Sequence, residues 1–277
     1  MHAIWTTINL FLQYLGNTGM IPKIIHYCWF GGNPLPSLAL ECIASWKKYL
    51  PDYEIRQWDE SNFDVNMIPY TAEAYKQKKY AFVSDFARFW IIYHYGGLYF
   101  DTDVEVIKPL DDIIAKGNFM GFEVDPDGDN TPGKYAPRFC FAVNPGVGFG
   151  MEKEHPFIKK MINLYAGLEF ELPPANIAWY KTIVAYTTEM LCEDGLKNIK
   201  GVQEVDGINI YPHDYFSPIN MISGRLHITP NTHTIHRFMG SWGVKKKSLK
   251  DIIRESLPEW IFILNNRIKR RKYRVNE

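Results

Sequence analysis

The sequence contains no apolar run of the roughly 20 residues that a membrane-spanning helix needs. Residues 1–19 lack the basic start and the small-residue cleavage site of a secretory signal peptide, so we interpret them as a non-essential N-terminal extension. Cysteine is scarce, and the four cysteines form no C-x-x-C pair, which excludes a zinc ribbon and argues against a disulfide framework. We therefore expect free thiols in a reducing cytosol at Cys28, Cys42, Cys140 and Cys192.

The chain also lacks net charge, because its 31 basic and 31 acidic residues cancel. Residues 245–277 nevertheless hold eleven Lys/Arg and four Asp/Glu, so this tail carries +7 and the remaining chain −7. An acidic body argues against binding to nucleic acid. The tail joins an apolar patch, 260–264, to a basic cluster, 267–274, which suits either an anionic membrane surface or a solvated terminus. We expect a cytoplasmic protein that can be peripheral on the inner face of the plasma membrane.

The first third of the chain has the pattern of an α/β fold. Residues 21–30 (IPKIIHYCWF) are apolar and β-branched and end at Gly31-Gly32, which predicts a buried strand. Helical spacing of apolar residues predicts a helix over Ser37–Tyr49, and alternation predicts a strand over Tyr53–Trp58. The order strand, helix, strand indicates layered α/β structure. We interpret His26 as a structural residue, because it faces away from Trp29 in the first strand.

The central part predicts one long helix and a strand with an acidic end. The helix covers Thr71–Tyr95, with Thr71 as its N-cap and Gly96-Gly97 as its stop. A buried strand, Leu98–Asp101, follows and continues as Thr102–Ile107. The remaining patterns predict one body over residues 20–244, with strands at 118–123, 138–143, 207–211 and near 227, and helices at 155–167 and 179–192.

The most informative segment is Gly96-Gly97-Leu98-Tyr99-Phe100-Asp101-Thr102-Asp103. On extended backbone, carboxylates at i and i+2 point to the same side. Two such carboxylates at the carboxyl end of a buried strand are costly unless a cation joins them, and hard oxygen ligands favour Mg²⁺ or Mn²⁺. That edge is also where open α/β sheets hold ligands. The alternative is a solvated turn.

The preceding predicted helix adds a second signal. Asp85 and Arg88 lie at i and i+3 on one face of an otherwise apolar run. They form either an intrahelical ion pair, or a carboxylate and a guanidinium presented to the hydroxyls and phosphate of a ligand.

Four segments, in this order along the chain, resemble those of a known family: IPKIIHYCWFGG, CIASWKKYLPDYEIRQW, AFVSDFARFWIIYHYGGLYFDTDVE and HTIHRFMGSW. They resemble the DXD-containing sugar transferases of glycosyltransferase family 32, which includes fungal Golgi mannosyltransferases and bacterial capsular or lipopolysaccharide sugar transferases. More distantly, they are similar to the glucosyltransferase domains of large clostridial toxins. The resemblance covers residues 20 to 243 and implies a GT-A-type nucleotide-sugar-binding fold, with a single mixed sheet flanked by helices.

The resemblance also implies roles for the residues at matching positions. Trp29 would stack on the base of the donor, while Asp85 and Arg88 would hold the sugar hydroxyls and the phosphate. Asp101 would contact the ribose and, through water, the metal, and Asp103 would bind the metal directly. A bound Mn²⁺ or Mg²⁺ would neutralise the nucleoside diphosphate leaving group as a Lewis acid.

Further positions match less specifically. Asn144 stands where such enzymes place a polar residue near the anomeric carbon, and Tyr99 is a candidate contact of the donor sugar. His236 is the candidate third metal ligand, because imidazole can complete a carboxylate-rich site. Ser241 and Trp242 match the closing Ser-Trp of the family and would cover the pyrophosphate. Plain packing is the open alternative for each aromatic, histidine and serine.

The implied function is metal-dependent transfer of a hexose, with retention, from a UDP- or GDP-sugar to a polysaccharide or lipid-linked oligosaccharide of surface polysaccharide biosynthesis. Residues 175–188 depart from the family pattern, which leaves the acceptor open. One alternative is a haloacid-dehalogenase-type phosphotransferase, although Glu105 occupies the place where that class needs a small or hydroxyl residue. The other is a non-catalytic sugar-binding protein, against which the complete set of acidic and basic residues argues.

Overall fold

The computed structural model of the 277-residue chain describes residues 20–126, 141–171, 182–220 and 224–239. The extension 1–19, the tail 245–277, Cys140, and the candidate residues Ser241 and Trp242 lie outside the described residues. Within the described ranges, Cys28 and Cys42 are free thiols, as predicted. No helix of the described chain combines the length and apolarity needed to cross a bilayer.

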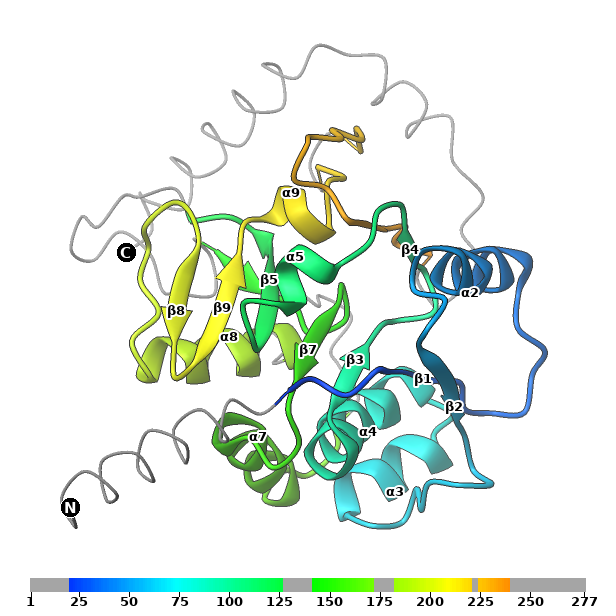
Figure 1. Cartoon of the computed structure of the whole chain (residues 1–277). Coiled ribbons are helices and arrows are strands. Elements are labelled where there is room, and N and C mark those ends of the chain that lie inside the picture. Colours follow the sequence, from blue (N-terminus) through cyan, green and yellow to red (C-terminus); the bar gives the residue numbers. More distant parts are fainter. Residues whose placement is uncertain (1–19, 127–140, 172–181, 221–223, 240–277) are drawn as a thin grey trace, which may run out of the picture.

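One mixed sheet forms the centre of the molecule (Figure 1). Its strands run in the order β2-β1-β3-β7-β5-β9-β8, and β6 pairs with β5 beside this path. β1 pairs in parallel with β2 and β3, whereas β7 is antiparallel to both of its neighbours. The bounds are β1 (Ile24–Cys28), β2 (Glu54–Trp58), β3 (Gly97–Tyr99), β5 (Phe119–Val124), β6 (Ala142–Val143), β7 (Phe149–Met151), β8 (Gln203–Val205) and β9 (Ile208–Tyr211).

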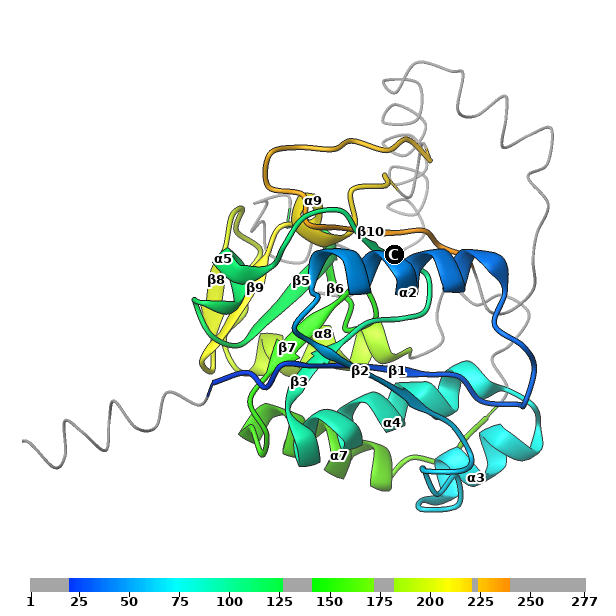
Figure 2. The ribbon, with the colours of Figure 1, turned by 45° about the vertical axis from the view of Figure 1, so that its right-hand side comes forward.

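Helices cover both faces of this sheet (Figure 2). They are α2 (Ser37–Tyr49), α3 (Pro69–Lys76), α4 (Tyr80–Tyr95), α5 (Asp111–Ile114), α7 (Pro156–Ala166), α8 (Ile183–Glu193) and α9 (His213–Phe216). Two apolar clusters result: one under α4, α7 and α8, the other under α2, α5 and α9. The α/β class and the mixed sheet flanked by helices are therefore confirmed.

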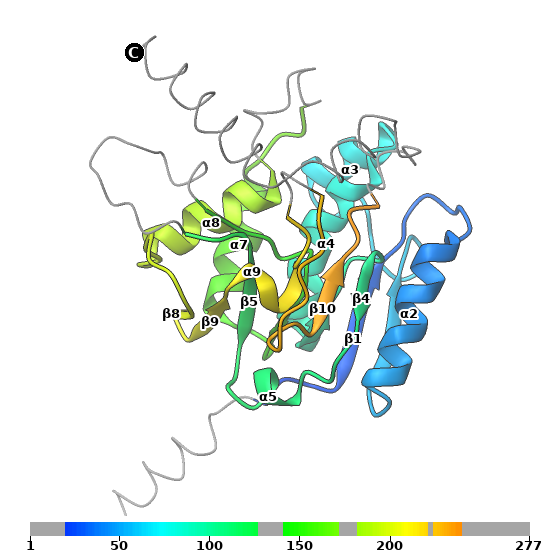
Figure 3. The same cartoon turned by 90° about the horizontal axis from the view of Figure 1, so that it is seen from above.

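A second, two-stranded sheet lies beside the main one, which the sequence patterns do not predict (Figure 3). It pairs β4 (Val104–Val106) antiparallel to β10 (Thr234–His236). The strand predicted over Leu98–Asp101 and continued over Thr102–Ile107 is therefore two strands in two different sheets. α2 packs on β4, and the Trp46 indole N–H donates to the Val104 carbonyl at 2.6 Å.

The single helix predicted over Thr71–Tyr95 is wrong: the segment forms α3 and α4, separated by residues 77–79. α3 begins before Thr71, whose hydroxyl donates to the Ile68 carbonyl instead of capping a helix. α3 ends in a Schellman motif, in which the N–H of Lys79 bonds to the carbonyl of Ala74 and the N–H of Lys78 to that of Tyr75. Lys78 has a φ of 58°, at the position where glycine usually marks such an ending.

Other predicted elements are confirmed with small shifts of their ends. α2 has the predicted bounds, and α7 is one residue shorter than predicted at each end. The strand predicted near His227 is only an isolated bridge between Ile219 and Leu226. The predicted domain bounds, 20–244, stay a prediction.

The predicted structural role of His26 agrees with its position in β1, where it is fully buried. Its Nδ1 accepts from the Trp58 indole N–H at 3.0 Å, and its Nε2 lies 3.0 Å from the Gly96 carbonyl oxygen, to which it donates. This neutral imidazole holds the backbone turn that leads into β3. The turn itself needs glycine, because a Cβ on Gly97 (φ 105°) would lie 2.6 Å from the Ile24 carbonyl oxygen.

Acid should weaken the fold through His26. Burial, which outweighs the bond to Gly96, lowers the pKa of His26 from 6.5 to about 4. The unfolded chain therefore binds the proton first, so this contribution to stability is complete above pH 6.5 and is lost as the pH falls toward 4. We expect up to about 3 kcal/mol from this residue. Urea unfolding at pH 7 and pH 4.5 should show a smaller pH dependence for His26→Gln than for wild type, whereas exposed His94→Gln should match wild type. An unchanged pH dependence in His26→Gln would contradict this role.

Candidate functional site

The main sheet has a topological switch point between β1 and β3. The connection from β1 to β2 passes through α2 on one face, and the connection from β2 to β3 passes through α3 and α4 on the other. Because these two connections run on opposite faces of the sheet, a crevice opens at the carboxyl ends of β1 and β3. A cavity of about 630 Å³ lies there, with Trp29 after β1 and Asp101 after β3 in its wall.

The two carboxylates of the Asp-x-Asp segment both line this cavity, but not on extended backbone as predicted. Residues 101–104 form a β-turn, in which the N–H of Val104 bonds to the carbonyl of Asp101 at 3.0 Å. The turn joins the two sheets, and the carboxylates at its first and third positions converge at the cavity. The side chain of Asp101 is 30% exposed and that of Asp103 11%.

Asp103 is held on two sides. Its Oδ2 accepts the backbone N–H of Met239 at 2.8 Å, and its Oδ1 lies 3.3 Å from Nε2 of His236 in β10. Burial works to raise the pKa of Asp103, but the bonds with His236 and Met239 outweigh it and hold the pKa below its usual value. The pairing of β10 with β4 thus brings two distant segments to one ionic contact.

Asp101, Asp103 and His236 form the one group in the described chain whose ligand atoms converge as a metal site requires, within 4.8 Å of one another. Burial works to lower the pKa of His236, but its carboxylate neighbours outweigh it and raise the pKa. The His236 Nδ1 is buried without a hydrogen-bond partner. Two carboxylates and an imidazole suit a divalent cation such as Mn²⁺ or Mg²⁺, so these residues fit the predicted metal.

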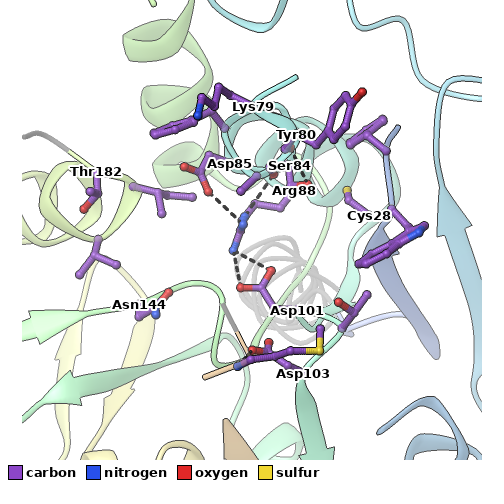
Figure 4. A pocket seen from close by; sticks show the side chains of 18 of the residues that line it. Cys28, Lys79, Tyr80, Ser84, Asp85, Arg88, Asp101, Asp103, Asn144 and Thr182 are labelled. Carbon is purple, nitrogen blue, oxygen red and sulfur yellow. Dashed lines mark hydrogen bonds and ion pairs between the residues drawn. The ribbon is translucent and has the colours of Figure 1, made fainter. Parts of the chain in front are cut away.

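Arg88 lies between two carboxylates of the site, those of Asp85 and Asp101 (Figure 4). Its Nη2 donates to Asp85 at 3.0 Å, its Nη1 lies 3.3 Å from Asp101, and its Nε donates to the Ser84 carbonyl at 3.2 Å. The ring of Tyr99 packs against the guanidinium, 4.7 Å away. Asp85 and Arg88 therefore form the intrahelical ion pair, and Arg88 also reaches the Asp-x-Asp turn.

The titration of these carboxylates reflects their burial. Burial raises the pKa of Asp85 to about 7, although Arg88 works against the shift. Burial also raises the pKa of Asp101, again against the effect of Arg88. Near neutral pH Asp85 can therefore either donate or accept a proton in a hydrogen bond with a ligand hydroxyl.

Asn144 lies across the cavity from the ion pair (Figure 4). Its Oδ1 accepts the backbone N–H of Gly146 at 2.7 Å, and its Nδ2 donates to Glu123 at 2.9 Å. Glu123, in β5, is a cavity residue that the sequence reasoning missed. Its only signal was a carboxylate at the end of a predicted buried strand.

The predicted aromatic contacts differ in their positions. Trp29 lines the cavity, and its indole N–H donates to the Asn33 carbonyl at 2.6 Å. Tyr99 is 1% exposed and lies behind Arg88, with its hydroxyl 3.4 Å from Asp101. The structure thus gathers Trp29, Asp85, Arg88, Asp101, Asp103, Asn144 and His236 around one cavity, whereas Tyr99 supports it from behind. Their functional roles stay predictions.

Three known proteins illustrate what this chain is similar to. The chain is 26% identical over 159 residues to inositol phosphoceramide mannosyltransferase 1 of Schizosaccharomyces pombe, covering 53% of this chain and 44% of that protein. It is 24% identical over 276 residues to the initiation-specific alpha-1,6-mannosyltransferase of Candida albicans, covering 80% and 72% of the two chains. The solved PaToxG glycosyltransferase is similar at 19% identity and a TM-score of 0.44, over 69% of this chain and 78% of that one.

The family comparison matches a segment that builds one part of the cavity wall. The model of a glycosyltransferase sugar-binding region containing a DXD motif matches residues 36–120, which include Asp85, Arg88 and the Asp-x-Asp turn. Residues 36–120 are therefore similar to the DXD-containing glycosyltransferase sugar-binding regions, which agrees with the resemblance and with the enzyme class predicted from the sequence.

Proposed function

We propose that this protein is a metal-dependent glycosyltransferase that moves a hexose from a UDP- or GDP-sugar to a glycan acceptor. The observation that carries the proposal is the convergence of Asp101, Asp103 and His236 at a cavity whose wall also holds the buried Asp85–Arg88 pair. A cation site beside a carboxylate and a guanidinium suits a ligand with both a diphosphate and sugar hydroxyls.

Asp101, Asp103 and His236 would hold the cation. When bound, the cation would supply positive charge to the departing nucleoside diphosphate. Asp103 has the anionic character that this role needs, because the Met239 N–H and His236 stabilise its charged form. Arg88 keeps Asp101 in place through their 3.3 Å contact.

The remaining cavity residues would bind and orient the donor. The indole of Trp29 offers a flat apolar face for a nucleobase. Asp85 faces the cavity and can bond a sugar hydroxyl, while Arg88 uses three of its five N–H donors in the contacts described and has others for a phosphate oxygen. Asn144 would lie near the reacting carbon of the sugar.

The acceptor is proposed to be a polysaccharide or a lipid-linked oligosaccharide of surface glycan synthesis, glycosylated with retention. Mannose is the first sugar to test, because the relatives described above are named as mannosyltransferases. The basic tail, 245–277, would bring the enzyme to the anionic inner face of the plasma membrane, and Ser241 and Trp242 would cover the pyrophosphate.

Donor binding provides the test. We expect GDP- or UDP-sugars with Mn²⁺ to raise the thermal midpoint, since a ligand at a hundred times its Kd stabilises by about 2.7 kcal/mol. EDTA should abolish the shift, and the nucleotide that works identifies the donor. Slow release of free nucleoside diphosphate with Mn²⁺ should accompany binding and would exclude a non-catalytic sugar-binding protein.

The opposite results would point elsewhere. No shift with any nucleotide sugar, with or without Mn²⁺, would contradict the proposal. A covalent aspartyl-phosphate on Asp101, detected by mass spectrometry after incubation with phosphate esters, would instead support a phosphotransferase.

A further inference from the structure

Glu123 has no role in the function proposed above, yet it lines the same cavity as the candidate metal ligands. It lies in β5, its side chain is 11% exposed, and its Oε1 accepts the Nδ2–H of Asn144 at 2.9 Å. The same oxygen lies 3.9 Å from Nδ1 of His236. A carboxylate with so little exposure needs a reason, because its desolvation is costly.

The imidazole of His236 lies between two carboxylates. Its Nε2 is 3.3 Å from Asp103 Oδ1, and its Nδ1 is the buried nitrogen without a hydrogen-bond partner. Glu123 is outside the group whose ligand atoms lie within 4.8 Å of one another, and its contact is with Nδ1, the ring nitrogen that does not contact Asp103. One nitrogen is thus directed to the candidate ligands and the other to Glu123.

We propose that Glu123 is a positioning residue that orients His236 for metal binding, an inference that rests on the proposed metal-dependent function. Histidines that bind metals almost always donate their second ring N–H to a carboxylate or carbonyl, which fixes both the tautomer and the ring. The Nδ1–H of His236 donates to Glu123 when the 3.9 Å between the two atoms shortens by about 0.7 Å, to the upper limit of a normal hydrogen bond. Nε2, the nitrogen nearest Asp103, then stays unprotonated and available as a ligand.

The surroundings of Glu123 are suited to this role. Asn144 holds its Oε1, and Asn144 is itself fixed by the N–H of Gly146 at 2.7 Å. On the histidine side, the ring of Phe238 packs against the imidazole with centroids 4.2 Å apart. Both partners are therefore held before a cation binds, so that little rotamer freedom remains to be lost.

The first measurement is the tautomer of His236 in metal-free Asp103→Asn protein, by ¹⁵N NMR at alkaline pH, where the imidazole is neutral. This background is used because the Asp103 carboxylate, 3.3 Å from Nε2, would itself favour a proton on that nitrogen, whereas a side-chain amide can donate to it. The resonances are assigned by their loss in His236→Asn. We expect the Nδ1–H tautomer in this background, and also when Glu123→Gln is added, because the carbonyl oxygen still accepts both N–H groups. Glu123→Ala should shift the ring toward the commoner Nε2–H form.

The second measurement is the Kd for Mn²⁺ alone, by electron paramagnetic resonance of the free ion. Glu123→Ala should weaken binding roughly 10- to 100-fold, and Glu123→Gln much less. The matched control is Glu152→Ala, which also removes an Asn-to-Glu contact (Asn118, 3.5 Å) but lies outside the cavity lining. It should leave both the tautomer and the Kd unchanged, and thermal melting checks that each variant is folded.

Either result is decisive. If Glu123→Ala changes neither the tautomer nor the Kd, Glu123 does not position His236. If wild type itself binds no Mn²⁺, the metal-dependent function fails, and the tautomer of the metal-free protein still decides whether Glu123 controls the ring.

Discussion

Replacing Asp103 by Ala should abolish Mn²⁺-dependent donor binding and lower the rate of glycosyl transfer by about a thousand-fold or more. The reason is that the carboxylate is 11% exposed, kept anionic by its bonds, and directed at the same point as Asp101 and His236. Neutralising the charge of a departing diphosphate is worth several kcal/mol in the transition state, and about 4 kcal/mol corresponds to a thousand-fold rate effect. Titration of Mn²⁺ and the rate at saturating Mn²⁺ measure the two losses.

The control must separate a lost ligand from a lost structural contact. Asp103→Ala also frees the N–H of Met239 and one contact of His236, which costs about 1–3 kcal/mol of unfolding free energy. Asp112→Ala is a matched change, because Asp112 contacts His233 at 2.8 Å in a similar aspartate–histidine pair outside the cavity lining. It should keep Mn²⁺ binding and the rate. An Asp103→Ala protein that still required Mn²⁺ and kept its rate would overturn the assignment of this residue.

Local patterns predicted those elements whose ends carry a chemical signal. Helix α2 is bounded as predicted, because apolar residues follow the helical period and Pro51-Asp52 follows its end. The end of α4 at Gly96 and Gly97 was equally clear from the sequence, because glycine readily takes the positive φ that both residues have. The break before α4 had no such signal, because Lys78 takes the left-handed position at the end of α3.

Features that depend on contacts between distant parts of the chain could not be predicted from these local patterns. The Asp-x-Asp segment looks like the end of a strand in isolation, but pairing of β4 with β10 turns it into a link between two sheets. The contact of Glu123 with His236 crosses 113 positions of sequence, as their numbers show, and no local periodicity encodes it. The candidate ligand His236 itself came from the resemblance, not from its local sequence pattern.

The site is therefore built from residues that are close in sequence and from residues that only the fold brings together. Residues 85–103 are close in sequence, and the family resemblance carried by this segment implied that Asp85, Arg88 and the two carboxylates act together. The opposite wall comes from β5, from the turn after β6 and from β10, and only the fold brings these to the cavity. In the turn after β6, the backbone of Gly146 lies directly against the side chains of Asp101, Asn144 and Arg88.

Gly146→Ala should inactivate the protein almost as thoroughly as the loss of a metal ligand. A Cβ on Gly146 would lie 2.1 Å from Asp101 Oδ2, 2.9 Å from Asn144 Oδ1 and 3.0 Å from Arg88 Nη1. Because Gly146 also accepts the N–H of Asp101 through its carbonyl at 3.1 Å, its backbone cannot retreat without breaking that bond. We expect a Mn²⁺ Kd and a rate each impaired by about a hundred-fold, since a shift of 1 Å at a site costs about that much.

Gly167→Ala is the matched control, because its Cβ would meet nothing closer than 3.6 Å and its φ of −95° is ordinary for alanine. It should behave as wild type in Mn²⁺ binding, rate and urea unfolding, whereas overpacking in Gly146→Ala should cost about 1–3 kcal/mol of unfolding free energy. A folded Gly146→Ala protein with unchanged Mn²⁺ affinity would mean that Asp101 can move away without loss. Asp101 would then not be a ligand fixed by Arg88, and the cation would depend on Asp103 and His236 alone.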